Sequence, residues 1–446
     1  MAIFGVSRRT GKEAFNILEN LLSQGYQGKV YPINPNTNEI LGVKVYPDIR
    51  ELPEKCDLAV INLPRDIVPQ VVEECITRGI ESVVIVTQGF VDANDEEGKE
   101  LQRELDELVT RNDVRILGPN TFGTANAFTN FSTAFAKLDM KQIPVGSICQ
   151  TGAFIVGFPF LKLVGKGIDL GNGCDVDFAD GLEYFEQDDD VEVVALHIEG
   201  TRDGTKFLKA AKKITPKKPV VALKTGQSEQ AAKAVQSHSG SLIGKNEIWD
   251  VALKQSGITR VGNVEELADT VKAFYTLPPM RGRRLGVITY TGGFGVMCID
   301  ACYKSGLEVA RLSSATGERL GAMFPSWQNV GNPADIWPSA MVAKKVSLSE
   351  VQEIAVETLL NDPGVDAVLC ILGAFTGTEA GIRHIIERAI ELQPDKPLVF
   401  HIYGPLADEM KKEPEERGGT LVFPTVDRAT TALGHLARYQ EFLSAL

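Results

Sequence analysis

The chain opens on a stretch that decides how its first third folds: AIFGVSRRTGKEAFNILENLLSQ, residues 2–24. The continuous apolar run over Ala2–Val6 predicts a buried β-strand, and the spacing of apolar residues over Lys12–Gln24 predicts an amphipathic helix. A turn of small and basic residues joins the two. A strand, a tight turn and a helix in this order make up the first half of a βα unit, so the stretch predicts a parallel sheet.

The same alternation continues through the first third of the chain. Further strands are predicted at Val30–Asn34, Leu58–Leu63, Ser82–Thr87 and Val114–Leu117. An amphipathic stretch at Ile67–Arg78 predicts a helix between two of them. Alternating strands and helices of these lengths predict a Rossmann-like domain over residues 1–125.

Two more series of alternating elements follow. The second has predicted strands near Ser147–Gln150, Ile168–Leu170, Val193–Ile198 and Val220–Lys224, and the third near Leu285–Tyr290, Ala367–Leu372 and Leu398–His401. Each series runs strand, small-residue turn and helix before further βα units, which is consistent with two copies of a flavodoxin-like domain. The linker-like segment Pro278–Arg284 divides them. We therefore expect an α/β protein with domains over 1–125, 126–278 and 279–446.

Composition and charge narrow the class of protein and its partners. Hydrophobic residues make up 43% and charged residues 24% of the 446 residues, which is typical of a globular chain with large cores. A net charge of −13 argues against a broad surface for nucleic acid or for an anionic membrane. No apolar run reaches the roughly 18 residues of a membrane span, and the seven scattered cysteines suit a reducing compartment. We expect a cytoplasmic protein that binds neither nucleic acid nor membrane.

The turn GVSRRTGK, residues 5–12, is the first candidate site. Its small residues permit close approach to a phosphate at a helix amino terminus, and Arg8, Arg9 and Lys12 add positive charge. A complete GxGxxG motif is missing, and no acidic residue follows the second strand, which ends in the sequence NPN, residues 34–36. Both absences weaken a dinucleotide-binding interpretation. A tight turn with solvated basic residues remains an alternative.

Two further turns at strand-to-helix junctions match each other. QTGAF, residues 150–154, offers the backbone N–H groups of Thr151, Gly152 and Ala153 at the beginning of a helix. YTGGFGV, residues 290–296, occupies the corresponding position in the last domain. We hypothesise that the two helix amino termini hold one anion between them. Each turn alone is equally consistent with a purely structural role.

His238 is the candidate nucleophile. It lies in SHSGSLIG, residues 237–244, whose Ser and Gly residues are typical of an exposed loop rather than an apolar core. A neutral imidazole is a competent nucleophile toward phosphorus, and a carboxylate partner fixes its tautomer. Glu199 is suitably placed because it follows the predicted strand Val193–Ile198, and catalytic groups of open α/β sheets gather at carboxyl ends of strands. A core histidine remains the alternative interpretation.

The other residues with chemical potential favour structural roles. The remaining four histidines lie on predicted strands or helices, where core or surface packing is the simpler interpretation: His197, His384, His401 and His435. Cys298 and Cys302 have no neighbouring cysteine or histidine to complete a metal site. No serine stands in the GxSxG context of a hydrolase. The sequence therefore predicts neither a resident metal nor a Ser-His-Asp hydrolase.

Taken in order, the motifs resemble one known family along nearly the whole chain. The matching segments are GVSRRTGK, YPINPNTNEILGVKVYP, VINLPRDIVPQVVEECITRGI, VTQGF, LGPNTFGTAN, QTGAF, LGNGCDVDFADGLEYFEQD, LHIEGTRDGTKFLKAA, SHSGSLIG and NVGNPADI. They resemble the α subunit of ADP-forming acetyl-CoA synthetases, one group of NDP-forming acyl-CoA synthetases. More distantly, they resemble the α subunit of succinyl-CoA synthetase extended by a further ligase domain. The collinear order of the matches makes this resemblance specific.

The resemblance implies a role for each candidate site. It implies that His238 is phosphorylated and that Glu199 is the carboxylate that stabilises phosphohistidine. It implies two phosphate-binding turns, made by Thr151, Gly152 and Ala153 and by Gly292, Gly293 and Phe294. It also implies a CoA site in the first domain, with the last of its residues near the reactive end of CoA: Gly5, Ser7, Arg8, Arg9, Thr10, Lys12, Asn34, Pro35, Leu63, Pro64, Thr87, Gln88, Gly89 and Asn120.

The family also implies a reversible reaction in three steps. Acyl-CoA and phosphate give acyl phosphate and CoA, acyl phosphate phosphorylates His238, and phosphohistidine transfers its phosphoryl group to ADP. The 446 residues contain no region that resembles an ATP-grasp domain. The resemblance therefore implies a partner β subunit that carries Mg²⁺ and ADP or ATP, in an α2β2 assembly. The Ser and Gly residues around His238 would let its loop swing toward that partner.

Three details depart from the family pattern. Few residues precede the first strand, so we expect the first βα unit to lack a covering segment. Asn36 stands where relatives often have lysine after Asn-Pro, which weakens one expected contact to a CoA phosphate. Phe154 is bulkier than its usual counterpart and is expected to reshape the acyl pocket. The motifs leave the acid open among short-chain, branched, aryl and dicarboxylic acids.

Two other functions remain open. A non-catalytic CoA-binding or acyl-CoA-sensing protein could share the fold, although a sensor has no use for the pair of His238 and Glu199. An NAD-dependent oxidoreductase could share the first domain, although the missing acid after the second strand disfavours it. The motifs favour an enzyme subunit, an acid–thiol ligase.

Overall fold

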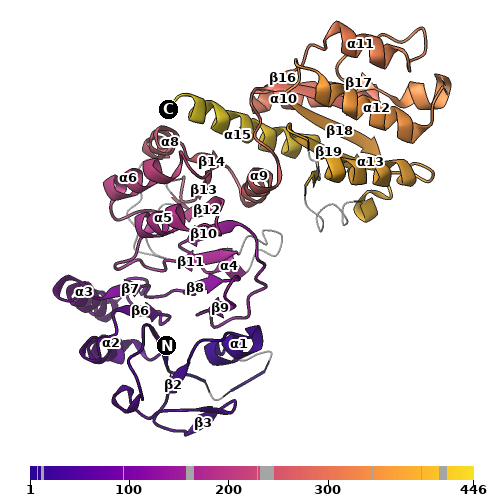
Figure 1. Cartoon of the computed structure of the whole chain (residues 1–446). Coiled ribbons are helices and arrows are strands. Elements are labelled where there is room, and N and C mark those ends of the chain that lie inside the picture. Colours follow the sequence, from indigo (N-terminus) through magenta and orange to yellow (C-terminus); the bar gives the residue numbers. More distant parts are fainter. Residues whose placement is uncertain are drawn as a thin grey trace. The chain divides into compact units, whose positions relative to one another are not determined.

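The computed structural model describes residues 1–7, 9–11, 15–93, 95–156, 165–228, 230–231, 246–343, 345–392, 394–410 and 419–446. These residues form two compact units, Met1–Val264 and Glu265–Leu446 (Figure 1). Each unit is built on mainly parallel strands, which confirms the predicted α/β class. Arg8, Lys12 and the segment 237–244 with His238 lie outside the described residues. No helix in the described ranges is both long and apolar enough to cross a membrane.

The first sheet of the first unit contains five parallel strands in the order β2-β1-β5-β6-β7. They are β1 Ala2–Phe4, β2 Tyr31–Ile33, β5 Ala59–Ile61, β6 Ser82–Ile85 and β7 Arg115–Leu117, and the short hairpin β3 Glu39–Ile40 and β4 Val43–Lys44 follows β2. All five predicted strands are present, each slightly shorter than predicted. Because the strands are parallel, the turns that follow them gather at one edge of the sheet, where ligands of such folds bind.

Three helices belong to this sheet: α1 Ile17–Gln24, α2 Val68–Thr77 and α3 Glu96–Arg111. The predicted start of the first helix at Lys12 is wrong, because α1 begins at Ile17. The side-chain oxygen of Asn16 accepts the N–H of Glu19, which satisfies an amide that a helix start leaves without an intrahelical partner. Gly25 ends the helix in the left-handed conformation, at φ 77°.

The second sheet of this unit contains seven strands in the order β14-β13-β12-β10-β11-β8-β9. Five are parallel: β10 Val145–Cys149, β11 Lys166–Asp169, β12 Val193–Ile198, β13 Val220–Lys224 and β14 Thr259–Val261. The hairpin β8 Thr124–Asn126 and β9 Phe131–Ser132 joins β11 in antiparallel orientation. The helices are α4, described over Ala153–Val156, α5 Phe178–Gln187, α6 Gly204–Ile214 and α8 Asn246–Gln255. All side chains of β12 and β13 are buried, as in strands covered on both faces.

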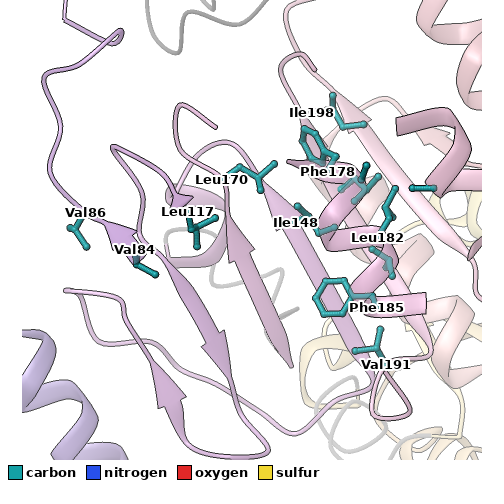
Figure 2. Close-up of a cluster of buried hydrophobic side chains, with 14 of the residues drawn as sticks. Val84, Val86, Leu117, Ile148, Leu170, Phe178, Leu182, Phe185, Val191 and Ile198 are labelled. Carbon is teal, nitrogen blue, oxygen red and sulfur yellow. The ribbon is translucent and has the colours of Figure 1, made fainter. Parts of the chain in front are cut away.

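One hydrophobic core connects the two sheets of the first unit. Figure 2 shows its members: Val84 and Leu117 come from the first sheet, Ile148 from the second, and Phe178 and Phe185 from α5. Burial of such side chains contributes roughly 25 cal/mol for each Å² of apolar surface removed from water. The shared core holds the carboxyl ends of the two sheets in a defined arrangement.

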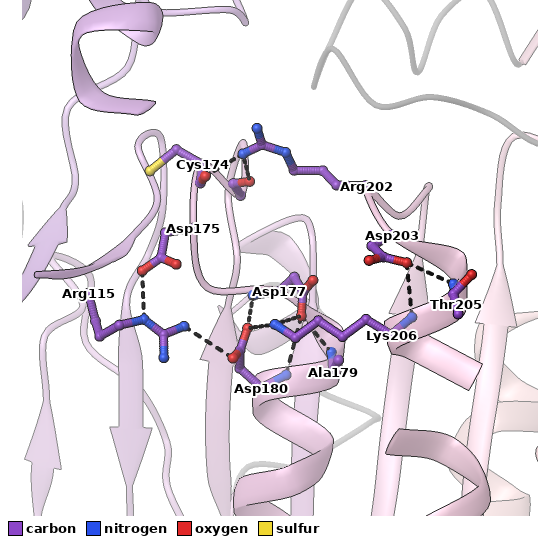
Figure 3. A network of polar contacts seen from close by, with 11 residues as sticks. Arg115, Cys174, Asp175, Asp177, Ala179, Asp180, Arg202, Asp203, Thr205 and Lys206 are labelled. Atoms are coloured by element: carbon purple, nitrogen blue, oxygen red, sulfur yellow. Dashed lines mark hydrogen bonds and ion pairs between the residues drawn. The ribbon is translucent and has the colours of Figure 1, made fainter. Parts of the chain in front are cut away.

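A polar network also ties α5 to the first sheet (Figure 3). Arg115, the first residue of β7, donates to Asp175 at 2.8 Å and to Asp180 at 3.1 Å. Asp180 additionally accepts Lys206 Nζ at 2.9 Å. Asp177 caps α5 by accepting two N–H groups of its first turn. The acidic residues of the motif LGNGCDVDFADGL therefore stabilise this junction.

The second unit has one sheet in the order β16-β15-β18-β19-β20, with β17 paired to β15. The strands are β15 Arg284–Thr289, β16 Glu308–Val309, β17 Ala334–Asp335, β18 Ala367–Gly373, β19 Leu398–Tyr403 and β20 Leu421–Phe423. The helices are α9 Val264–Thr276, α10 Gly292–Ser305, α11 Ser314–Gly321, α12 Leu348–Asn361, α13 Glu379–Leu392 and α15 Val426–Ser444. The three strands predicted for this part of the chain are confirmed.

Two helical layers cover the sheet of the second unit. Successive residues of β18 alternate between two cores: Val368 and Cys370 pack with residues of α12 and α13, whereas Leu369 and Ile371 pack with residues of α10 and α15. From Glu265 on, α9 belongs to this unit. The guanidinium of Arg428, on α15, donates to the two carboxylate oxygens of Asp269, on α9, at 2.5 and 2.8 Å. The domain limits at residues 125 and 278 stay predictions.

Candidate functional site

The turn after β1 requires glycine at residue 5. Gly5 has a φ of +73°, and a Cβ atom there would lie 1.9 Å from the carbonyl oxygen of Asn62, which follows β5. The hydroxyl of Ser7 accepts the N–H of Arg9 at 3.0 Å, and the carbonyl oxygen of Ser7 accepts the side-chain amide of Asn16 at 2.9 Å. Local contacts thus fix the described part of this turn at the carboxyl edge of the sheet.

Gly5→Ala is expected to destabilise the first unit and to weaken the predicted binding of CoA, because the added Cβ atom pushes the turn away from Asn62. Thermal unfolding and calorimetric titration with CoA measure the two effects. Gly42→Ala is the matched control: its φ is +77°, but no atom lies within 4 Å of the new Cβ. The control is expected to lose about 1 kcal/mol from backbone strain alone. Equal losses in both variants would contradict the importance of the contact with Asn62.

A carboxylate of the chain already interacts with the end of this turn. The N–H of Gly11 donates to both carboxylate oxygens of Glu19 at 3.0 Å. Arg9 and Thr10, both predicted for CoA, are exposed. The described part of the loop therefore presents the basic side chain of Arg9 near the predicted anion site, while the amide of Gly11 is already bonded to Glu19.

Asn34 connects the ends of β1 and β2. Its N–H donates to the carbonyl oxygen of Tyr46 at 2.9 Å, and its side-chain amide donates to the carbonyl oxygen of Val6 at 3.3 Å. Its side-chain oxygen accepts the N–H of Asn36 at 2.9 Å, which closes a local turn. Asn34 thus shapes the predicted CoA turn, and Pro35 is its exposed member.

Thr87 joins the ends of β5 and β6. Its hydroxyl donates to the carbonyl oxygen of Leu63 at 2.7 Å and accepts the N–H of the same residue at 3.1 Å. Its carbonyl oxygen accepts the N–H of Asn120 at 2.9 Å. The carbonyl oxygen of Gly89 accepts the guanidinium of Arg65 at 2.8 Å. Leu63, Thr87, Gly89 and Asn120, which the sequence assigns to CoA, therefore meet at one edge.

The turn QTGAF follows β10 and begins α4. The N–H of Phe154 donates to the carbonyl oxygen of Thr151 at 3.0 Å, which starts the helical turn. The first amides of a helix have no intrahelical acceptor and favour anions. A Cβ atom at Gly152 would lie 1.9 Å from the ring of Phe122, so this ring covers one side of the turn.

A cavity of about 610 Å³ brings two groups of predicted residues together. Its lining consists of Phe15, Asn62, Pro64, Arg65, Val86, Thr87, Gln88, Asn120, Thr121, Phe122, Phe135, Gln150, Thr151, Gly152, Ala153 and Asp169. Four of these are predicted for CoA and three for phosphate. The other described CoA candidates do not line it: Gly5, Ser7, Arg9, Thr10, Asn34, Pro35, Leu63 and Gly89. Its volume lies within the range of small-molecule sites.

Aromatic side chains that the sequence does not single out form part of the cavity wall. The rings of Phe122 and Phe135 lie 4.2 Å apart, and Phe15 meets Phe135 edge to face at 5.6 Å. Such packing supplies an apolar surface next to the polar groups of the turn. Phe15 and Phe135 lie outside the matching motifs, and Phe122 lies in LGPNTFGTAN, from which only Asn120 is assigned a role.

Asp169 contributes a buried carboxyl group to the same wall. Its carboxyl oxygen accepts the N–H of Phe122 at 2.7 Å, and its carbonyl oxygen accepts the hydroxyl of Thr121. Burial raises the pKa of Asp169 to about 6 and raises that of the neighbouring Cys149 thiol. Asp169 therefore fastens the loop with Phe122 to the second sheet beside the phosphate turn.

Glu199 directly follows β12 and is buried, with 7% of its surface exposed. Its N–H donates to Gln150 Oε1 at 2.8 Å, and its carbonyl oxygen accepts Lys224 Nζ at 2.9 Å. It lies at the carboxyl edge of the second sheet, where the sequence places it. The pairing of Glu199 with His238 stays a prediction, since His238 lies outside the described residues.

The turn YTGGFGV begins α10 in the second unit. The hydroxyl of Thr291 accepts the N–H of Gly293 at 3.1 Å and caps the helix. A Cβ atom at Gly292 would lie 3.9 Å from a carboxylate oxygen of Asp335. The ring of Phe294 packs on the tyrosine that ends β19, with centroids 4.4 Å apart. The sharing of one anion by this turn and QTGAF stays a prediction.

The other four histidines make structural contacts. His197 is stacked on Phe154 at 5.0 Å, and burial lowers the pKa of its imidazole to about 4. The other three contact a carbonyl oxygen of β20, a glutamate of α12 and a glutamate of α9: His401, His384 and His435. Within the described ranges, no three His, Cys, Asp or Glu side chains are arranged to hold a metal ion.

Two family models together match most of the first unit and most of α9. The model described as a CoA binding domain matches residues 1–127. The model described as a succinyl-CoA ligase like flavodoxin domain matches residues 144–274. The first match contains the GVSRRTGK turn, and the second contains the QTGAF turn and Glu199.

Characterised relatives extend the likeness over the whole chain. The ADP-forming acetate–CoA ligase II subunit alpha of Pyrococcus furiosus is 36% identical over 439 residues, covering 96% of this chain and 93% of the relative. The ADP-forming acetate–CoA ligase II of Archaeoglobus fulgidus is 34% identical over 461 residues, covering 98% of this chain. This chain spans 65% of the length of the Archaeoglobus protein.

A solved structure supports the same relationship. The dinucleotide forming acetyl-coenzyme A synthetase 1 of Ca. Korarchaeum cryptofilum, in complex with phosphate and ADP, matches with a TM-score of 0.89 at 30% identity. The match covers 99% of this chain and 96% of that one. The resemblance and the fold class predicted from the sequence are confirmed, and this chain belongs to the family of ADP-forming acetate–CoA ligases.

Proposed function

We propose that this chain is the CoA-binding, phosphohistidine-carrying component of an NDP-forming acyl-CoA synthetase. The reaction is acyl-CoA + ADP + phosphate ⇌ carboxylic acid + CoA + ATP. One observation carries the proposal: a single cavity is lined by Pro64, Thr87 and Asn120, predicted for CoA, and by the turn Thr151–Ala153, predicted for phosphate. A thioester and a phosphate held in one cavity meet the geometric requirement of the first step.

In the first step, an oxygen of phosphate attacks the carbonyl carbon of the thioester. The C–S bond breaks, CoA leaves as its thiol after gaining a proton, and acyl phosphate remains. We assign the phosphate to the beginning of α4, because N–H groups at a helix start favour negative charge. CoA is a substrate in this reaction, and it would enter along the edge formed by Leu63, Thr87 and Asn120.

In the second step, an imidazole nitrogen of His238 attacks the phosphorus of acyl phosphate. The bond between phosphorus and the acyl oxygen breaks, and the carboxylate leaves. The imidazolium that results is stabilised by a neighbouring carboxylate, the role that we assign to Glu199. ADP then accepts the phosphoryl group, which yields ATP and returns His238 to its neutral form.

The third step requires a nucleotide site, which we assign to an ATP-grasp domain that binds Mg²⁺ and ADP or ATP. A separate β subunit in an α2β2 assembly would supply it, in keeping with the name subunit alpha of the Pyrococcus relative. The greater length of the Archaeoglobus relative is equally consistent with such a domain on one polypeptide. The seven buried thiols support a cytoplasmic location.

The first two steps need only residues of this chain, so the chain alone is expected to be labelled by ³²P-acetyl phosphate. Phosphohistidine is labile in acid and stable in base, so the label should show this stability. It should also be absent from His238→Ala. A control incubation with ³²P-phosphate and acetyl-CoA should give the same product. A label that persists in His238→Ala, or a wild-type chain that takes up no label from acetyl phosphate or from the acyl phosphates of branched, aryl and dicarboxylic acids, would exclude the proposed function.

A further inference from the structure

Two side chains from neighbouring strands hold the main chain of Glu199. In the second sheet, β12 lies between β10 and β13. Gln150, which follows β10, accepts the N–H groups of Glu199 and Gly200 at 2.8 and 3.0 Å. Lys224, the last residue of β13, donates from Nζ to the carbonyl oxygen of Glu199 at 2.9 Å. Side chains from the β10 and β13 sides therefore hold the main chain of Glu199, in place of the backbone hydrogen bonds that pair the strands.

Lys224 is an unusual residue for this position because only 2% of its surface is exposed. Its ammonium also donates to the carbonyl oxygen of Thr225 and lies 5.5 Å from the centre of the Trp249 ring. Among the described residues, no carboxylate pairs with it directly. Burial of an ammonium whose described contacts are carbonyl dipoles and an aromatic face is costly. A role in holding Glu199 would explain why a lysine stands at this position.

The charges around Lys224 make its protonation state sensitive to pH. Burial lowers the pKa of Lys224 to about 8, Arg260 of β14 lowers it further, and Glu199 opposes both effects. Among the described residues, His197 on β12 is a further titratable neighbour, and its pKa of about 4 leaves it neutral near pH 7. The ammonium form therefore predominates at neutral pH and is lost as the pH rises through about 8.

We propose that Lys224 is a positioning residue that holds Glu199 in place for the phosphorylation of His238. This inference rests on the proposed function and adds a residue that no motif in the sequence marks. Without the ammonium, the carbonyl oxygen of Glu199 loses its donor, and the segment that follows β12 loses the tether on its β13 side. The carboxylate would then be presented less accurately to the histidine, which slows the chemical step without changing substrate binding.

The test compares Lys224→Met and Lys224→Arg with the wild-type chain in single-turnover labelling by ³²P-acetyl phosphate. Lys224→Met is expected to slow labelling about 10-fold at saturating acetyl phosphate, with little change in the concentration that gives half-maximal rate. Lys224→Arg keeps a donor and a charge, so it should restore most of the rate. It also keeps the inference testable if Lys224→Met does not fold.

Lys166 supplies a matched control, because it is another buried lysine of the same sheet. It lies at the amino end of β11, where it pairs with Asp188 and Asp190 at 2.7 Å. Lys166→Met is expected to lower the unfolding temperature while leaving the labelling rate per folded chain unchanged. A rate loss equal to that of Lys224→Met would assign both lysines a merely structural role and overturn the inference.

The pH dependence of the labelling rate is a second measurement, and a merely structural role of Lys224 would leave it unchanged. In the wild-type chain the rate should fall as the pH rises through about 8, because the neutral amine of Lys224 is a weaker donor to the carbonyl oxygen of Glu199 than the ammonium and carries no charge. Lys224→Arg should lack this alkaline limb, since guanidinium remains protonated. A limb that persists in Lys224→Arg, or a wild-type rate in Lys224→Met, would overturn the inference alone. A wild-type chain that takes up no label from any of the acyl phosphates would overturn the proposed function and the inference together.

Discussion

Replacing Glu199 with glutamine is expected to slow the labelling of His238 by ³²P-acetyl phosphate about 100-fold, the upper range for the loss of a group that orients a reactive histidine. The amide has nearly the same shape as the carboxylate but carries no charge to stabilise imidazolium. The fold should persist, because Gln150 and Lys224 hold the main chain of residue 199 rather than its side chain. Single-turnover labelling and circular dichroism measure the two properties.

Glu192→Gln makes the same chemical change at the opposite end of the same strand. Glu192 is exposed and precedes β12, so this variant should label at the wild-type rate. CoA binding should be unchanged in both variants, because neither residue lines the cavity. Wild-type labelling in Glu199→Gln would remove Glu199 from the proposed mechanism. A fall in thermal stability that accounts for the whole loss would give Glu199 a structural role instead.

The strands of this protein are predictable because a strand that is buried on both faces requires apolar residues at successive positions, which appear in the sequence as a continuous apolar run. Val193–Ile198 and Val220–Lys224 are predicted with the bounds that the structure shows, and every residue in them is buried. The start of α1 is not predictable from periodicity. The apolar spacing extends back to Lys12, but the side chain of Asn16 bonds to the backbone and sets the first turn at Ile17.

The hairpin of β8 and β9 shows a different limit. Four of its nine residues from Thr124 to Ser132 are apolar, but none is a β-branched aliphatic residue and their alternation breaks after residue 127. It becomes a strand pair because β11, far along the chain, provides an edge to which β8 adds in antiparallel orientation. Pairing of this kind depends on tertiary contacts, so a window of local sequence contains little of the information.

The candidate site also contains residues that the sequence predicts and residues that only the structure reveals. The turn Thr151–Ala153 is predictable from local sequence, since small residues at a strand-to-helix junction are a local signal. Thr87 and Asn120 are predicted only by the family resemblance. Phe122 and Asp169 are not, because the bond between them depends on the pairing of β8 with β11, which lie about 40 residues apart in the sequence. The sequence therefore predicts the polar floor of the cavity and misses its aromatic and acidic wall.

Matching motifs also mix structural with chemical residues. The motif LGNGCDVDFADGL supports the family resemblance as strongly as QTGAF does. In the structure, Asp177 caps α5, and Asp175 and Asp180 bind Arg115 of the first sheet (Figure 3). None of these three carboxylates lines the cavity that contains Thr87 and the turn Thr151–Ala153. Their role is to fix the junction on which the cavity depends.

Phe185→Ala is expected to destabilise the first unit by about 3–5 kcal/mol, the usual range for removing a fully buried phenylalanine. None of the surface of Phe185 is exposed. Its ring lies against the backbone of β10: a Cβ atom at Gly146 would meet the ring at 2.9 Å. The ring also belongs to the core that connects the two sheets (Figure 2). The cavity left by alanine would therefore loosen the junction as well as α5.

Differential scanning calorimetry measures the effect as a fall of about 10 °C in the unfolding temperature of the first unit, for a unit of this size. Glu183→Ala, an exposed position on the same helix, should change that temperature by less than about 2 °C. Because Phe185 belongs to the core of the first unit, a separate transition of the second unit should keep its unfolding temperature. A Phe185→Ala chain that melts like the control would contradict a shared core as the main support of the junction. Lost CoA binding below the melting temperature would show that the cavity depends on this ring even while the unit remains folded.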